Sequence, residues 1–300
     1  MKTFYLFVLV AWCFTSVSNA SATQGFPEKI RVRIAAYNVL FGIWAKPERV
    51  GDLFKPYNLD VIGFSEVPDG DWTERVGRVL GMKYTYVGKS SSANHKDKYK
   101  SILSRTPMRS MHEVAIEAKG WSPASLVGAE IVVRGIPILV YSTHIPGRPA
   151  FTDAADGSAA EFIAESVIPH AWSISKATGR NLVILGDLNN LPGDEPLRRI
   201  EGKGMRSIWD ELNIHTPRLS THLHIETGKE SGVIDHIYYN KDSKARTIMG
   251  GIIYSAFNPP WEEKEMSNYK LEWEQYGKPL SDHRPVWAVL EFPVTSSGIH

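Results

Sequence analysis

Acids, amides and imidazoles recur at the ends or breaks of apolar, strand-like runs in this sequence. Asn38 closes the run RVRIAAYN, Glu66 closes LDVIGFSE and His144 closes IPILVYSTH. A single residue of this kind is usually a turn former or a cap, but the repetition predicts one shared polar site on one rim of the sheets. The set also includes Asp187 and Asn189 in GDLN, Asp235 and His236 in GVIDHIYY, and Asp282 and His283 ahead of RPVWAVLEF.

These residue types favour metal-assisted chemistry on an anionic substrate. Carboxylates are the hard oxygen ligands that Mg²⁺ and Mn²⁺ prefer, and Glu66, Asp187 and Asp282 supply three of them. Histidines such as His144 and His283 can stabilise negative charge as cations or can move protons. The sequence has no Gly-rich phosphate loop and no Gly-x-Ser-x-Gly elbow, which disfavours nucleotide-dependent phosphoryl transfer and an α/β-hydrolase mechanism.

The composition is that of a globular protein. Of the 300 residues, 43% are hydrophobic and 22% are charged, which excludes disorder, collagen and a coiled coil. With 34 Lys+Arg against 33 Asp+Glu, the formal net charge is +1. This excludes a strongly basic nucleic-acid-binding protein, although a local basic groove would still be compatible with this net charge.

Residues 1–22 have the layout of a secretory signal peptide, so we expect a secreted or periplasmic protein. Lys2 precedes an apolar run of 11 residues, and small residues follow. The run is too short to span a bilayer, and Trp12 disfavours a lipid anchor at Cys13. Cleavage would remove Lys2 and the single cysteine, which excludes a thiol nucleophile, a cysteine zinc site and disulfides. The alternative is a buried N-terminal strand or helix.

The remainder is predicted to form one domain, residues 23–293, followed by a short tail, 294–300. A helix is predicted over 50–57 from its apolar spacing, and another from the capping box at Ser158, with a kink at Pro169 and an end near Gly179. Two packed sheets with helices outside them would fit this alternation. Strands are predicted at 31–40, 59–65, 101–104, 126–133, 136–143, 182–185, 233–239 and 285–292.

The ordered set of motifs resembles the endonuclease/exonuclease/phosphatase superfamily, which includes deoxyribonuclease I, abasic-site endonucleases, neutral sphingomyelinases and inositol polyphosphate 5-phosphatases. The resemblance extends from about Arg31 to Phe292 and is most specific in GDLN and in SDHRP. It implies an α/β fold, a four-layer α/β/β/α sandwich of two packed, mostly antiparallel sheets. It also implies Mg²⁺ or Mn²⁺ as cofactor, with Asn38, Glu66 and Asp282 on the metal side.

The same resemblance implies the catalytic roles. Asp187 is similar to the residue that orients or deprotonates the attacking water, and Asn189 to the neighbour that contacts the phosphate. His283 is similar to the imidazole at the scissile phosphate, with Asp235 as the carboxylate that holds it. His144 is similar to the second histidine of the nuclease and sphingomyelinase branches.

Several residues depart from the pattern of the family or carry no clear role. Ser65 stands where the family often has Gln, and Lys100 stands where a small residue is common. Lys100 is a candidate for binding the substrate phosphate, although it and nearby Lys98 also suit a solvated loop. His222 and His224 lack a nearby third metal ligand in the sequence and suit a loop, whereas the alternation of the strand favours a structural role for His236.

The function that these features favour is an exported, divalent-metal-dependent phosphoester hydrolase. A phosphodiesterase is favoured, because His144 is present. The alternatives are a phosphomonoesterase acting on a small phosphorylated metabolite, a nuclease similar to deoxyribonuclease I, and, last, a non-enzymatic binding module. The expected partner is a phosphoester, whether a lipid headgroup, a small organic phosphodiester or nucleic acid. No stable protein partner is implied, and the mature chain has no transmembrane segment.

The segment Phe257–Tyr276 is predicted to select the substrate, because it ends just before the SDH motif. It contains five glutamates against two lysines, a balance that should repel a long polyanion. Its aromatic residues, among them Trp261 and Trp273, could pack on an apolar or ring-bearing leaving group. The alternative is an insertion that covers the edge of a sheet.

Overall fold

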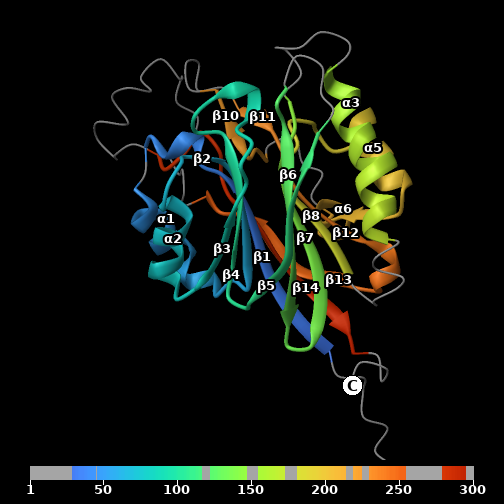
Figure 1. Ribbon diagram of the computed structural model, residues 1–300. Coiled ribbons are helices and arrows are strands. Elements are labelled where there is room, and N and C mark those ends of the chain that lie inside the picture. Colours follow the sequence, from blue (N-terminus) through green and yellow to red (C-terminus); the bar gives the residue numbers. More distant parts are fainter. Residues whose placement is uncertain are drawn as a thin grey trace, which may run out of the picture.

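Two β-sheets lie face to face in the computed structural model of the protein, with helices on both outer sides (Figure 1). Among the described residues, each of the two sheets has six strands, and a separate pair of short strands lies beside them. This is the α/β sandwich that the sequence predicts. The structure describes residues 29–44, 46–116, 122–146, 155–172, 181–213, 219–224, 230–254 and 279–294.

The first sheet has the strand order β13-β14-β1-β2-β4-β3. Among these strands, β1 and β2 are the parallel pair and every other neighbouring pair is antiparallel. The first described strand, β1, pairs with the last, β14, over eight residue pairs from Lys29–Pro293 to Ala36–Val286. The strands are β1 Lys29–Asn38, β2 Val61–Val67, β3 Tyr84–Val87, β4 Tyr99–Ser104, β13 Arg246–Ile252 and β14 Val286–Pro293.

The second sheet has the order β5-β6-β7-β8-β12-β9 and repeats the same arrangement. Here β7 and β8 are the parallel pair within the described strands, and the other neighbours are antiparallel. The two-stranded sheet pairs β10 His222–Leu223 with β11 Glu230–Gly232. The strands of the second sheet are β5 Met108–Ala115, β6 Ser125–Val133, β7 Ile136–His144, β8 Asn181–Asp187, β9 Met205–Ser207 and β12 Asp235–Asn240.

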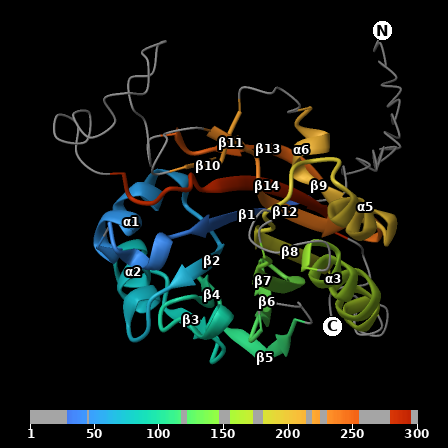
Figure 2. The ribbon, with the colours of Figure 1, turned by 90° about the horizontal axis from the view of Figure 1, so that it is seen from above.

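The four layers are held together by three apolar cores. Side chains of both sheets, such as Ile34 and Leu185, pack in the core between the sheets. Helices α1 Pro47–Phe54 and α2 Trp72–Leu80 cover the outer face of the first sheet, and α3 Ala155–Phe162 with α5 Glu195–Gly202 covers the second (Figure 2). A short helix, α6 Ile208–Glu211, follows β9. The sheets approach closely at Gly63, where an added Cβ would lie 1.9 Å from the Leu185 side chain.

The strand predictions are confirmed, with bounds that differ by a few residues at most. The prediction that the capping box at Ser158 opens a helix is wrong, because the helix begins at Ala155. Because residues 155–157 are already helical, Ser158 lies within the helix and not at its N-terminus. The helix continues through a π turn, Ile163–Val167, which lies just before Pro169. Gly179 lies outside the described residues.

Strands β3, β5, β9, β10, β11 and β13 were not predicted from the sequence. Of these, β3, β5 and β13 lie at the edges of the sheets and are only partly buried, so their residues lack the continuous apolar run of a central strand. The other three have only two or three residues each. In the part of the chain that the structure describes, no helix is long and apolar enough to cross a membrane.

Candidate active site

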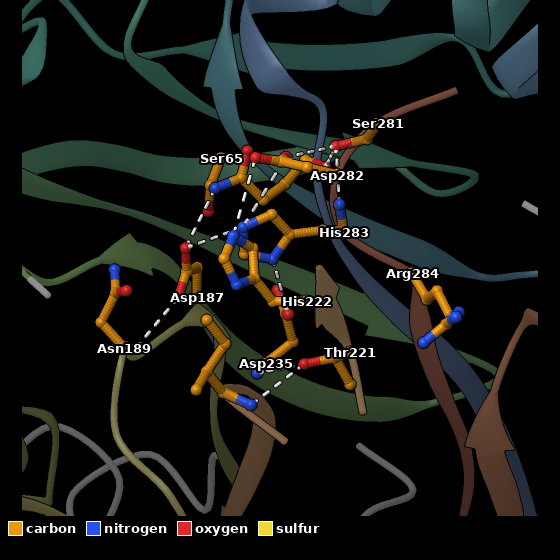
Figure 3. Close-up of polar contacts among 12 residues, drawn as sticks. Ser65, Asp187, Asn189, Thr221, His222, Asp235, Ser281, Asp282, His283 and Arg284 are labelled. Carbon is orange, nitrogen blue, oxygen red and sulfur yellow. Dashed lines mark hydrogen bonds and ion pairs between the residues drawn. The ribbon is translucent and has the colours of Figure 1, made fainter. Parts of the chain in front are cut away.

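The polar residues predicted to form a site meet where the two parallel strand pairs end. Asn38 ends β1 and Glu66 lies in β2 of the first sheet, while His144 and Asp187 end β7 and β8 of the second. Strand β12 runs the opposite way and begins with Asp235, directly paired with Asp187. Because the carboxyl ends of parallel strands share one edge, the two sheets bring their polar ends to the same rim. Figure 3 shows many of these side chains, with Asp282 and His283 among them.

Glu66 reaches the site through an irregularity in its strand. The register between β2 and β4 shifts between Phe64 and Val67, and Glu66 has a positive φ of 53°. A bulge of this kind redirects a side chain that the regular alternation would place elsewhere. The Glu66 side chain is 10% exposed, and its Oε1 lies 3.9 Å from Lys98 Nζ. Burial raises the pKa of Glu66 to about 7, against the opposing effects of Lys98 and His283.

Asp187 is the centre of the contacts in the site. Its Oδ2 accepts a hydrogen bond from Asn38 Nδ2 at 3.0 Å, and its Oδ1 accepts one from the Asn189 backbone N–H at 2.9 Å. The Nε2 atoms of His144 and His283 lie 3.5 and 3.6 Å from Oδ2. Burial raises the pKa of Asp187 to about 7, and the charge of His283 opposes the rise.

His283 is held as a cation by carboxylates. Its Nδ1 lies 2.8 Å from Asp235 Oδ2, and both side chains are buried. Burial by itself would lower the pKa of His283, but the carboxylates of Asp235, Asp187 and Asp282 outweigh that effect and hold the pKa well above its usual value. Asp235 is fixed in turn, because Thr221 Oγ1 accepts its backbone N–H. The predicted pairing of Asp235 with His283 is present in the structure.

The pKa of His144 is shifted the other way, although its Nδ1 lies 3.8 Å from Glu66 Oε1. Burial, reinforced by Lys100, Lys98 and His283, lowers its pKa well below the usual value. Its Nε2 lies 3.2 Å from Asn189 Nδ2, which also donates a hydrogen bond to the Ile145 carbonyl. Asn189 therefore orients His144 in this arrangement. A contact between Asn189 and the phosphate stays a prediction.

Asp282 lies beside His283, with its Oδ1 4.0 Å from His283 Nε2, and its role on the metal side stays a prediction. Its charge adds to the rise in the pKa of Glu66, and its Oδ1 lies 3.2 Å from Ser281 Oγ. The Ser281 hydroxyl donates a hydrogen bond to the Asn38 carbonyl at 2.8 Å, and it accepts the backbone N–H of His283 at 3.1 Å. The SDH motif is thus anchored to the end of β1.

Sequence reasoning missed His222. We expected no third ligand near it, but His222 Nε2 lies 3.7 Å from Asp282 Oδ2 and its ring centroid lies 4.6 Å from that of His283. The expectation failed because the contact comes from an isolated β-bridge between His222 and His283, far apart in the sequence. No local spacing could have indicated it.

Lys100 is not part of a solvated loop. It is completely buried on β4, and its Nζ donates hydrogen bonds to the Ser90 carbonyl and Ser92 Oγ, each at 3.1 Å. The expectation of a solvated lysine is wrong, because the loop folds back over β4. In this arrangement Lys100 supports the loop that carries Lys98, and Lys98 is the lysine beside Glu66.

Among the remaining predicted residues, His236 is described by the structure, whereas two tryptophans are not. His236 is fully buried, with its Nε2 2.8 Å from the Asn190 carbonyl, and burial lowers its pKa to about 4. These features agree with a structural role. Trp261 and Trp273 lie outside the described residues.

The chain matches a known protein family in sequence and in fold. The family model described as "Endonuclease/Exonuclease/phosphatase family" matches residues 35–283. A family protein from Bacteroides thetaiotaomicron superposes with a TM-score of 0.68 at 14% identity, covering 92% of this chain and 99% of that chain. No match was found among curated protein sequences.

Two further solved structures share the fold at similarly low identity. Truncated Caenorhabditis elegans TDP2 has a TM-score of 0.61 at 15% identity and covers 88% of this chain and 98% of its own. The human Nocturnin catalytic domain, solved with a bound sulfate anion, has a TM-score of 0.60 at 14% identity and covers 89% and 97%. With the family model matching most of the chain, this protein belongs to the endonuclease/exonuclease/phosphatase family, whose enzymes hydrolyse phosphoesters.

Proposed function

We propose that the protein is an exported, divalent-metal-dependent phosphodiesterase. The observation that carries the proposal is the convergence of His283 and His144 on one oxygen of Asp187, with His283 held as a cation by Asp235. In such a pair, the carboxylate can activate water and the fixed imidazolium can stabilise the negative charge that develops on a phosphate. Both groups are buried, where such charges act more strongly than in water.

The residues present fit a divalent cation. Glu66 and Asp282 offer hard carboxylate oxygens, which suit Mg²⁺ or Mn²⁺. The third predicted residue, Asn38, accepts the Leu40 N–H at its Oδ1 and donates from its Nδ2 to Asp187, each at 3.0 Å. The pKa of Glu66 is raised to about 7 because the carboxylate is buried with too little compensating positive charge, and a bound cation would supply that charge. When bound, such an ion would polarise a phosphate oxygen and stabilise the negative charge that develops on the leaving oxygen.

The chain's own residues supply the other steps of the proposed reaction. Asp187, held by Asn38 and by the Asn189 backbone, orients the attacking water and accepts its proton. His283 places a positive charge at the phosphate as negative charge accumulates. Lys98, 12% exposed beside Glu66, is positioned to contact a phosphate oxygen.

Charge supports a diester over a monoester. Glu66, Asp187, Asp235 and Asp282 place four carboxyl groups in or beside the site, whereas Lys98 and His283 are the described cations nearest to them. A diester carries one negative charge and a monoester approaches two, so the acids repel the monoester more strongly, and a bound divalent cation would reduce that difference. His144 also favours a diester, because it is similar to the second histidine of the nuclease and sphingomyelinase branches of the family.

Nucleic acid stays among the candidate substrates. One structural neighbour is D. rerio TDP2 complexed with a single-strand DNA product, at 12% identity and a TM-score of 0.61.

The proposal that the protein is exported rests on the layout of residues 1–22. Measuring the mass of the secreted chain tests whether these residues are removed. A protein retained in the cell at full length would contradict export.

The test of the proposed function is hydrolysis of bis-p-nitrophenyl phosphate compared with p-nitrophenyl phosphate. Turnover should require Mg²⁺ or Mn²⁺, cease with EDTA and return when metal is restored in excess. Asp187→Asn, which keeps the size of the side chain, should lower kcat by roughly 10²-fold or more. Full activity in metal-free buffer would reject the mechanism.

A further inference from the structure

We infer that His222 and Asp282 form a metal position that includes a nitrogen ligand, so that the site binds a transition-metal ion such as Mn²⁺ in preference to Mg²⁺. The inference rests on the proposed function, because it concerns the metal that the site uses. His222 belongs to none of the motifs that indicated the site. Its position beside Asp282 emerges only in the folded chain.

The spacing of His222 and Asp282 allows both to bind one ion. His222 Nε2 and Asp282 Oδ2 are 3.7 Å apart, which is ion-pair range and longer than an ordinary hydrogen bond. Two ligands each about 2.1 Å from one ion can be separated by such a distance. Asp282 Oδ1 contacts Ser281 Oγ at 3.2 Å, and Oδ2 is the oxygen toward His222. The side chains of His222 and Asp282 are 18% and 11% exposed, so an ion could enter.

The scaffold around His222 is rigid. The Leu223 N–H donates to the Asp282 carbonyl at 2.9 Å, and the Arg284 N–H donates to the Thr221 carbonyl at 2.7 Å, so β10 is fixed on both sides of His222. The buried Arg284 guanidinium also donates two hydrogen bonds to Glu230 on β11, at 2.9 and 2.8 Å. Metal ligands are generally held by such surrounding bonds.

The chemical consequence is selectivity for the metal. Mg²⁺ prefers oxygen ligands and keeps much of its water. Imidazole suits Fe²⁺, Ni²⁺, Cu²⁺ and Zn²⁺ best, and Mn²⁺, which also favours oxygen ligands, lies at the weak end of that series. Glu66 and Asp282 alone would bind either ion. A nitrogen from His222 adds affinity for Mn²⁺ and for later metals, and adds little for Mg²⁺.

The experiment measures Mn²⁺ and Mg²⁺ binding by titration calorimetry for the wild-type protein, His222→Gln and His224→Gln. His224 is the matched control, because it is an exposed histidine two residues away with its ring 5.3 Å from that of His222. We expect His222→Gln to weaken Mn²⁺ binding by roughly tenfold or more and to change Mg²⁺ binding less than about threefold. Equal effects on both metals, or no effect on either, would overturn the inference.

Pulsed electron paramagnetic resonance of the Mn²⁺ complex gives a second measurement that does not depend on the variant's affinity. Coupling to a histidine ¹⁴N should be present in the wild type and in His224→Gln, and absent in His222→Gln. A wild-type complex without nitrogen coupling would refute the assignment even if the variant failed to fold. Hydrolysis of bis-p-nitrophenyl phosphate is followed separately. Its absence with every metal would reject the proposed function, whereas the binding and resonance data decide the ligand.

Discussion

Two histidines of the site differ in charge although both are buried and both approach Asp187. His283 faces Asp235, Asp187 and Asp282, which raise its pKa, whereas His144 faces Lys98 and Lys100, which reinforce the lowering caused by burial. The identity of the neighbours, and not burial alone, decides the charge of each ring. This assigns a cationic role to His283 and leaves His144 as a neutral donor or acceptor.

The pairing of His283 with Asp235 predicts that their mutational effects do not add. Groups that act as a unit lose most of their effect when either is removed. We expect His283→Ala and Asp235→Ala each to lower kcat/KM by roughly 10²-fold or more, and the double variant to be little worse than His283→Ala alone. The kinetics are measured with bis-p-nitrophenyl phosphate at saturating metal. Fully multiplicative losses would show that the two residues act independently.

The raised pKa of Glu66, about 7, predicts that metal affinity depends on pH. A carboxyl group must lose its proton before it binds metal. Below pH 7 Glu66 holds a proton that the metal must displace, whereas above pH 7 it is ionised. The Mg²⁺ dissociation constant should therefore fall as pH rises from 6 to 8, by up to roughly tenfold per pH unit for each proton released. Calorimetry in buffers of different ionisation enthalpy should show this proton release, and affinity independent of pH would contradict it.

The strands position the site through close backbone contacts at their ends. Gly186, just before Asp187, has φ 138°, and a Cβ added there would lie 1.9 Å from the Thr143 carbonyl oxygen of β7. Beside it, Ser65 Oγ donates to the same carbonyl from the first sheet at 3.0 Å, and Ser142 Oγ donates to the Phe64 carbonyl at 3.2 Å in return. The two sheets are therefore hydrogen-bonded to each other directly beneath the acids.

Gly186→Ala should be strongly destabilising, because β7 and β8 would have to separate where they carry His144 and Asp187. We expect a loss of about 3 kcal/mol in the free energy of unfolding, measured by denaturant titration. Gly202→Ala is the control, because a Cβ there meets nothing within 4 Å and alanine should leave stability unchanged or slightly higher. Equal stability of the two variants would show that the strand ends can shift without cost.

The sequence predicts this site only as far as its signals are local. Asn38, Glu66, His144, Asp187 and Asp235 are visible because each ends or interrupts an apolar run, and the runs become the central strands. The contacts of His222 and Lys100 depend on how distant segments fold together, through the bridge to His283 and the loop folded over β4. The bulge at Glu66 is likewise a matter of pairing with β4, which no local pattern encodes.

For the molecule as a whole, the question is which phosphoester it accepts. After removal of residues 1–22 the chain would carry equal numbers of basic and acidic residues, so long-range attraction to a polyanion is weak. The acidic, aromatic segment 257–276 precedes the SDH motif and lies outside the described residues. Its place at the rim stays a prediction from connectivity.

Replacing Trp261 and Trp273 by alanine tests whether that segment selects the substrate. We expect the double variant to lose activity on sphingomyelin or on an aryl diester, since aromatic rings stabilise apolar or ring-bearing leaving groups. Plasmid nicking should be weak in both proteins. The three substrates are compared at equal metal and protein concentration. Efficient plasmid cleavage by the wild type that is unchanged in the variant would contradict the proposal.

The pairing of β1 with β14 also determines when the protein can fold during its synthesis. The first sheet places β1 between β2 and β14, so that sheet stays incomplete until residues up to Pro293 have left the ribosome. His283, which precedes β14, is among the last residues of the site to be made. A chain with such distant pairings folds late and slowly. For a protein that we propose is exported, this delay would keep the chain unfolded for translocation and would withhold hydrolytic activity from the compartment in which it is made.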